Sequence, residues 1–270
     1  MNHFTLSLIS RNLLRIFGVC MCIFMIVPLL AVVPISFSSG NFLSYPMPGL
    51  SLKWYEKIFS DGPWMKALST SLIVGVSATV LATVLGTLAA LAFARKNLSG
   101  ASGLLALLIS PMIIPPVISG LGMYFLFGAL GLTGTISGLI IAHTALATPF
   151  VLINVAASLQ GFDMTLLRAA AMSGAAPHRA FANIALPIIA PGVVSGALFA
   201  FMTSFDEIVV VLFIGGPSQR TLPRQMFDGL RDTIDPSIVA MSSFLLVIGI
   251  AGLISTIWLS QRSHKVLASA

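Results

Sequence analysis

The sequence predicts an all-α membrane protein whose chain crosses the bilayer six times. Three observations lead to this prediction: 57% of the 270 residues are hydrophobic, the mean hydropathy is +1.02, and only 8% of residues are charged. Soluble domains carry roughly 25% charged residues. The composition therefore excludes an ordinary soluble enzyme, a disordered chain and a nucleic-acid-binding protein.

Six apolar runs are long enough to cross a membrane, which takes about 20 helical residues. Residues 97–162 contain no formal charge, and the segment GALGLTGT divides them into two spans. The first run is longer than the apolar part of a signal peptide, so we expect it to be retained as a helix. The predicted spans cover residues 16–37, 67–94, 102–127, 136–159, 188–214 and 237–260.

The positions of Lys and Arg predict that both termini lie in the cytoplasm, because cytoplasmic loops collect these residues. With this orientation, the cytoplasmic segments hold eight Lys and Arg residues against one acid, Asp163, which gives a net charge of +7. The outer segments hold six Lys and Arg residues against seven acids, a net charge of −1.

Nothing in the sequence predicts catalysis or metal binding. Cys20 and Cys22 lie in an apolar run, His3, His178 and His264 are isolated, and His143 is expected to be a hydrogen-bonded packing residue within a span. The chain has no Gly-rich lysine motif for ATP, so we expect no catalytic residue, no metal site and no cofactor in this chain.

Small or helix-breaking residues mark three of the predicted spans. Ala78, Ala82, Gly86 and Ala90 in the second span, with Gly192 and Gly196 in the fifth, predict close helix packing. The third span instead contains Pro111, Pro115 and Pro116. A broken helix at membrane depth is tolerated beside a water-filled cavity, so these prolines predict either a solute pathway or a kinked packing helix.

A helical hairpin is predicted between the fourth and fifth spans. Asp163 is a good N-cap for a helix over residues 164–173, and Gly174 suits the left-handed residue that ends it. Pro177 suits the first turn of a second short helix, which we expect to stop before Pro187. The apolar residues of the hairpin predict either a partner-binding surface or packing against the chain's own bundle; these residues are Met164, Leu167, Phe181 and Ile184.

The hairpin sequence RAAAMSGAAPHRAFANIALPIIAP resembles the EAA loop of ABC importer permeases, the membrane subunits served by a separate ATPase. The family pattern is followed by Ala169, Ala170, Gly174 and the I-x-L-P ending formed by Ile184, Leu186 and Pro187, whereas Arg168 occupies the position that is most often Glu. The resemblance implies that residues 164–181 form a coupling helix in a groove of the ATPase. The implied coupling residues are Asp163, Leu167, Arg168, Ala169, Ala170, Gly174, Ala175, Pro177, Phe181 and Pro187.

Residues 201–246 are also similar to the second permease of spermidine/putrescine-type systems, and this resemblance covers about residues 67–262. It implies a type I ABC importer permease fold in the bacterial inner membrane, with residues 1–66 as an N-terminal helix and first periplasmic loop, 67–262 as the permease domain and 263–270 as a cytoplasmic tail. The implied partners are a second permease, two ATP-binding subunits that use ATP and Mg, an external solute-binding protein and membrane lipid.

The solute implied by this resemblance is a polyamine or another small cationic or organic molecule. Asp206 and Glu207 interrupt the fifth span, and acids within a span usually face a cavity or a partner. They predict either a cation-attracting site or a structural role, as an ion pair or a helix-end contact. Candidate pathway residues beside them are the aromatic rings of Tyr124 and Phe205, through cation–π contacts, and Pro115 and Pro116 of the third span.

Two other classes of function remain open at this point. In a secondary transporter, or half of one, His143 or the acidic pair would couple transport to ion flow. A membrane scaffold would transport nothing. The hairpin discriminates between an ABC importer permease and a secondary transporter, because a secondary transporter has no need of a loop with the EAA spacing.

Overall fold

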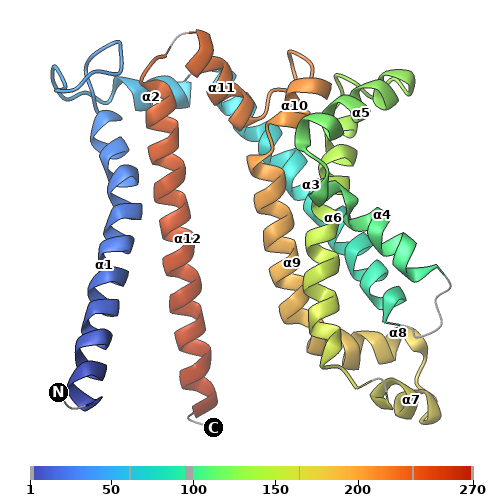
Figure 1. Ribbon diagram of the computed structural model, residues 1–270. Coiled ribbons are helices and arrows are strands. Elements are labelled where there is room, and N and C mark those ends of the chain that lie inside the picture. The colour runs from blue at the N-terminus through green and yellow to red at the C-terminus, as the bar shows by residue number, and fades with distance from the viewer. Residues whose placement is uncertain (1–2, 61, 95–99, 164, 233, 269–270) are drawn as a thin grey trace. The chain divides into compact units, whose positions relative to one another are not determined.

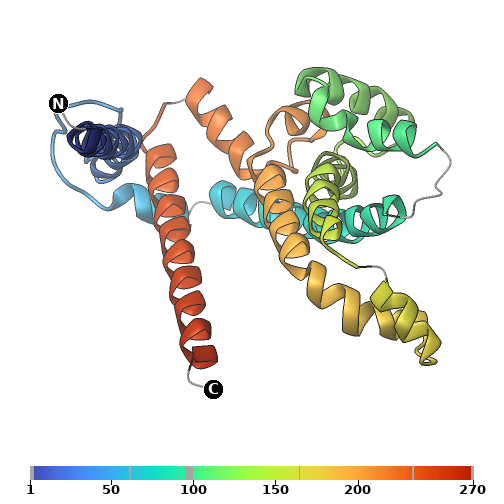
Figure 2. The same cartoon turned by 60° about the horizontal axis from the view of Figure 1, so that its bottom comes forward.

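The computed structural model describes residues 3–60, 62–94, 100–163, 165–232 and 234–268, and within these ranges the chain is helical, with a single isolated β-bridge between Ser38 and Leu50. The chain forms two compact units (Figures 1 and 2). The terminal unit contains Met1–Met65 and Met226–Ala270, and the central unit contains Lys66–Gln225. The predicted domain boundaries at 66/67 and 262/263 stay predictions.

The terminal unit is built on two long helices, α1 (His3–Ile35) and α12 (Ser237–Ala268), which run in opposite directions and contact each other (Figure 1). The short helix α2 (Lys53–Ser60) is amphipathic and buries Trp54 and Ile58. It packs on α12, where the rings of Phe59 and Phe244 meet edge to face at 5.1 Å. The predicted first span extends two residues beyond the end of α1.

The core of the central unit is α6 (Ile136–Gln160), which packs against α3 (Gly62–Phe93) on one side and α9 (Leu186–Asp206) on another. Val151 of α6 touches both neighbours. A β-carbon on Gly86 would lie 2.7 Å from Val151 Cβ, and one on Gly196 would lie 2.8 Å from Val151 Cα. Only glycine fits at these distances, so the predicted packing through small residues is confirmed.

The predicted third span is not one helix. It consists of α4 (Ala101–Ile113) and α5 (Pro116–Ala129), which meet at an angle of 108°. Ile114 and Pro115 between them have extended backbone, with ψ of 131° and 134°. The sequence Pro115-Pro116 removes two backbone donors and disfavours helical backbone in the residue before each proline, which explains why the break is sharp and not a kink.

Two predictions were wrong, one about the second helix of the hairpin and one about the end of the fifth span. The helix does not stop before Pro187: α8 (Pro177–Ala180) continues through a π-helical turn, η1 (Phe181–Ala185), into α9. In this turn the Leu186 N–H donates to the Phe181 carbonyl, and the wider turn gives the ring of Pro187 room. At the other end, α9 stops at Asp206, Glu207 is extended, and α10 (Val209–Ile214) follows as a separate helix.

The remaining helices are α7 (Thr165–Met172) and α11 (Leu222–Asp232). Among the described residues, four helices are long and apolar enough to cross a membrane, and a fifth candidate is the bent pair of α4 and α5. In α12 the apolar segment Ser237–Gly252 is shorter than a full span. The structure therefore supports an all-helical membrane protein, and the count of six spans stays a prediction.

Candidate coupling hairpin and solute site

Asp163 caps the first helix of the hairpin, as predicted. Its Oδ1 accepts a hydrogen bond of 2.9 Å from the Thr165 N–H at the start of α7. This backbone hydrogen bond is the main reason why the pKa of Asp163 is below its ordinary value, and the positive charge of Arg168 lowers it further. Met164 lies outside the described residues.

The turn after α7 has the geometry of a Schellman motif. Gly174 has a φ of +79°, the Gly174 N–H donates to the Ala171 carbonyl, and the Ala175 N–H donates to the Ala170 carbonyl, both at 3.0 Å. Pro177 then occupies the first turn of α8. The predicted hairpin geometry around Gly174 and Pro177 is therefore confirmed, although its second helix continues into α9.

The two sides of α7 differ in exposure. Its inner side contacts α8 and η1, with Leu167 and Ala170 half-buried. Its outer side carries four exposed residues at positions i, i+3, i+4 and i+7, which share one helical face. We call them the α7 ridge: Thr165, Arg168, Ala169 and Met172. Phe181 and Ile184 are half-buried, so the apolar side chains of the hairpin divide between internal packing and solvent.

The two acids after the fifth span have different surroundings. Glu207 Oε1 accepts a 2.8 Å hydrogen bond from the Val210 N–H and so caps the start of α10. Asp206 is exposed, and its carboxylate has no hydrogen-bonding or ionic partner among the described residues. Glu207 therefore has a local structural role, whereas Asp206 is free to interact with a ligand.

Asp206 lies at one of the hollows of the central unit. The hollow has a volume of about 590 Å³ and is lined by Met202, Thr203, Phe205, Asp206 and Glu207. Met202 and Thr203 were not among the predicted pathway residues, although both lie one helical turn before Asp206 and that spacing could have indicated them. The ring of Phe205 stacks on Phe201 at 5.5 Å.

The other candidate pathway residues do not line this hollow. Tyr124 is exposed on α5, where its ring meets that of Phe125 at 5.6 Å. Pro115 and Pro116 are exposed at the break between α4 and α5. The structure therefore brings Phe205, Asp206 and Glu207 together and leaves the other three residues on a different element.

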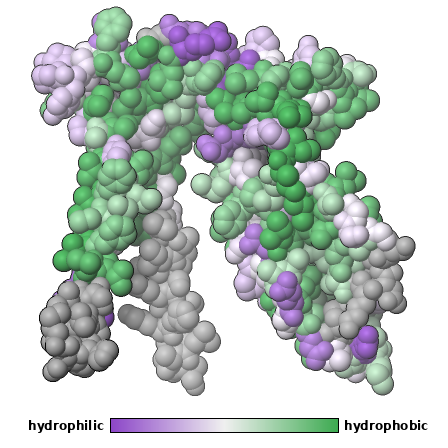
Figure 3. Space-filling model, viewed as in Figure 1, coloured by the Kyte–Doolittle hydropathy of each residue, from purple (hydrophilic) through white to green (hydrophobic). Residues whose placement is uncertain are grey.

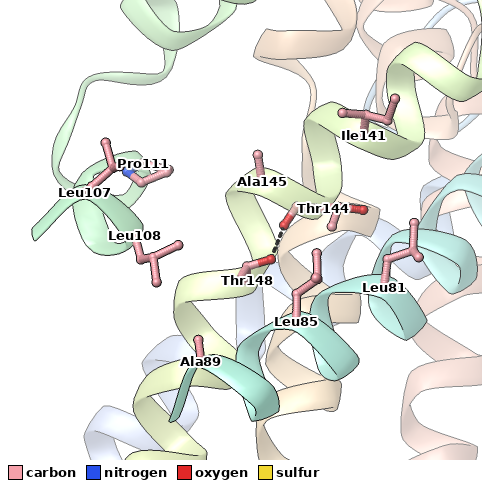
Figure 4. Close-up of a pocket in the computed structure, with 10 residues that line it drawn as sticks. All are labelled: Leu81, Leu85, Ala89, Leu107, Leu108, Pro111, Ile141, Thr144, Ala145 and Thr148. Carbon is pink, nitrogen blue, oxygen red and sulfur yellow. Dashed lines mark hydrogen bonds between the residues drawn. The ribbon is translucent and has the colours of Figure 1, made fainter. Parts of the chain in front are cut away.

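A second hollow lies between α3, α4 and α6 and has a volume of about 560 Å³ (Figure 4). Its walls are almost entirely aliphatic, and Pro111 of the third predicted span is one of its lining residues. Its two hydroxyls are satisfied within α6: Thr144 donates to the Ile140 carbonyl and Thr148 to the Thr144 carbonyl, both at 2.7 Å. This groove suits hydrocarbon and offers nothing to a charged solute.

His143 is a packing residue, as predicted. It is 1% exposed, and its Nδ1 lies 2.8 Å from Ser204 Oγ, which links α6 to the last turn of α9. Its Nε2 has no hydrogen-bonding partner in the described part of the chain. The described residues also contain no group of three side chains that could hold a metal ion.

Residues 82–265 match the family described as binding-protein-dependent transport system inner membrane component. The chain is 32% identical to the putrescine transport system permease protein PotI of Escherichia coli K12, over 90% of this chain and 88% of that protein. It is 28% identical to the spermidine/putrescine transport system permease protein PotC of the same organism, over 96% and 97% of the two chains. It is 32% identical to the molybdenum transport system permease protein ModB of Mycobacterium bovis, over 77% and 85%.

The fold is shared with a solved bacterial ABC transporter involved in the import of the acidic polysaccharide alginate. The TM-score is 0.69 at 15% sequence identity, and the match covers 95% of this chain and 96% of the other. The family match covers more than half of this chain and agrees with its apolar helices. The chain therefore belongs to the binding-protein-dependent transport system inner membrane component family, as a permease component of an ABC importer in the bacterial inner membrane.

Proposed function

We propose that this permease forms half of the translocation pathway for a small cationic solute of the polyamine class, and that Asp206 attracts the solute. The observation that carries the proposal is the free carboxylate of Asp206 at the edge of its hollow. Glu207 makes the contrast clear, because its carboxylate is already used by the Val210 N–H.

The chemistry of the hollow suits an alkylammonium ion. A carboxylate attracts an ammonium group more strongly at a protein surface than in bulk water, since the effective dielectric constant there is nearer about 20 than about 80. The paired rings of Phe201 and Phe205 add an aromatic surface beside it. Aromatic faces bind ammonium groups through cation–π contacts, while Met202 contacts methylene groups.

The named relatives support a polyamine, but percentage identity alone does not choose the solute. Two relatives are named for putrescine and for spermidine/putrescine, and a third, at the same 32% identity as the first, is named for molybdenum. The residues of the hollow are therefore the more direct guide. A negative charge at Asp206 favours a cation over an anion.

We further propose the assembly in which this chain works. The chain spans the membrane six times with both termini in the cytoplasm and pairs with a second permease. Two ATP-binding subunits, which use ATP and Mg²⁺, dock on the cytoplasmic hairpins, and an external solute-binding protein delivers the solute. Closure of the ATP-binding subunits moves α7 and opens the pathway outward; release of ADP reverses the movement.

Uptake of labelled putrescine by cells that produce the complete transporter tests the role of Asp206. Asp206→Asn keeps the shape of the side chain and removes its charge, so uptake at low putrescine concentration should fall about tenfold. Glu207→Gln is the matched control: its amide oxygen still accepts the Val210 N–H, and uptake should change much less. Native uptake by Asp206→Asn would contradict the proposed solute site.

The orientation is tested with single cysteines in a variant that lacks Cys20 and Cys22. A thiol reagent that does not cross the membrane should label cysteines placed at Ser51 and Ser218 from outside. Cysteines at Ser99, which lies outside the described residues, and at Ser263 should remain unlabelled. Labelling of the second pair would overturn the proposed orientation.

A further inference from the structure

The α7 ridge carries one charged side chain, Arg168, and one strongly exposed apolar side chain, Met172. Met172 is 90% exposed, and Arg168 lies one turn before it on the same face. Figure 3 shows isolated hydrophilic patches within an apolar surface at the end of the central unit where α7 and α8 lie. A partner that covers Met172 must therefore also remove water from Arg168.

Arg168 has no hydrogen bond or ion pair among the described residues. Its charge reaches Asp163, but the pKa of that carboxyl is lowered chiefly by the backbone hydrogen bond from Thr165, and Arg168 contributes least. No other acid is available in the hairpin, because the next acidic residue along the sequence is Asp206. Arg168 therefore has only a weak electrostatic interaction with Asp163 and forms no ion pair among the described residues.

Covering an unpaired guanidinium is unfavourable, because the charge loses its hydration and gains nothing in return. An arginine offers a planar set of N–H donors that matches a carboxylate in two parallel hydrogen bonds. The partner surface that best offsets this loss of hydration is thus an apolar patch with a carboxylate about one helical turn away.

We propose that the α7 ridge docks on an ATP-binding subunit whose groove places an Asp or Glu side chain against Arg168 and an apolar surface against Met172. This inference rests on the proposed function of the hairpin. It adds the sign of the charge in the groove. That sign is opposite to the one that a glutamate at position 168 would select.

Zero-length cross-linking tests the carboxylate directly. Arg168→Lys, in the complete transporter, places an amine where a water-soluble carbodiimide can join it to a touching carboxylate. We expect a covalent product between this chain and the ATP-binding subunit, with an Asp or Glu of that subunit identified by mass spectrometry. Arg11→Lys, an exposed position on α1, is the matched control and should give no such product. Absence of the product from Arg168→Lys overturns the inference.

Affinity measurements separate this inference from the function on which it rests. Arg168→Glu should weaken binding of the ATP-binding subunit to the detergent-solubilised permease pair about tenfold. Arg168→Lys keeps the charge but loses the two-bond geometry, so it should weaken binding less, and Arg11→Glu should stay close to native. If Met172→Asp prevents binding but Arg168→Glu does not weaken it, the hairpin docks and the acidic groove is wrong. If neither substitution changes binding, the hairpin is not the docking element and the proposed coupling function fails as well.

Discussion

Helices α1 and α6 each provide an apolar stretch of 25 residues, but they have opposite surroundings. In α1 the stretch is Arg11–Ile35, and none of its most apolar part is buried within this chain. In α6 it is Ile136–Gln160, and 61% of the corresponding part is buried. The more apolar helix of the two is the more exposed one.

The comparison shows that apolarity and burial are separate properties in a membrane protein. Lipid is as apolar as a leucine side chain, so an apolar residue gains little by moving from lipid to protein. What marks α6 as a core helix is its neighbours' glycines, its hydroxyls and His143, because these residues need close packing or a polar partner. We expect substitutions in the two helices to have correspondingly different effects.

The largest difference should come from a matched pair of glycine substitutions. Gly196→Leu places a β-carbon 2.8 Å from the backbone of Val151, so α6 and α9 must separate, at a cost of about 3 kcal/mol or more. Gly18→Leu in α1 meets nothing within 4 Å. Thermal unfolding of the purified chain in detergent should show a large loss of stability for Gly196→Leu and none for Gly18→Leu. Equal losses would mean that α1 is packed as tightly as α6.

A smaller effect is expected from the buried hydrogen bond between α6 and α9. Ser204→Ala leaves both ring nitrogens of His143 buried without a partner in the described chain, which should cost about 1–3 kcal/mol of the unfolding free energy. Thr144→Val is the control, since the Thr144 hydroxyl bonds only to its own helix. The two variants can be compared in the same unfolding assay, and similar stability would show that His143 finds another partner.

The smallest effect concerns the terminal unit, where Lys57 Nζ lies 2.8 Å from Asp235 Oδ2 before α12. Burial by itself would raise the pKa of Asp235, but hydrogen bonds from Lys57 and Ser237 and the charge of Lys57 outweigh it, so the pKa is lowered. A lowered carboxyl pKa stabilises the fold above the ordinary value of 3.8, and this contribution is lost as the pH falls through the folded-state value.

Asp235→Asn should therefore destabilise the chain slightly at pH 7, by about 0.5 kcal/mol, because the pair is partly exposed. The difference between native and variant chains should shrink as the pH is lowered below 3.8. Unfolding temperatures measured across that range check the sign. A difference that grows at low pH would rule out a stabilising role for the carboxylate.

The sequence predicted the structure best where a conformation depends on residues that are close along the chain. The cap at Asp163, the left-handed Gly174 and the start of α8 at Pro177 are all determined within a few positions. The prolines locate the break between α4 and α5, but the angle of 108° could not be predicted, because it depends on the packing of α5 on α10, where Phe213 lies against Gly120. The separate roles of Asp206 and Glu207 depend on the end of α9, which the apolar run through residue 214 concealed.

The π-helical turn η1 sets the direction in which the hairpin projects from α9. The turn closes on the fifth residue instead of the fourth, so it contains one residue more than an α-helical turn. Each residue of an α-helix advances the side chains by about 100° around the axis. Deleting Ala182 would restore α-helical spacing and swing α7 and α8 to another side of α9, with every side chain of the hairpin intact. The direction in which the hairpin projects from α9 therefore depends on the one additional residue of this π-helical turn.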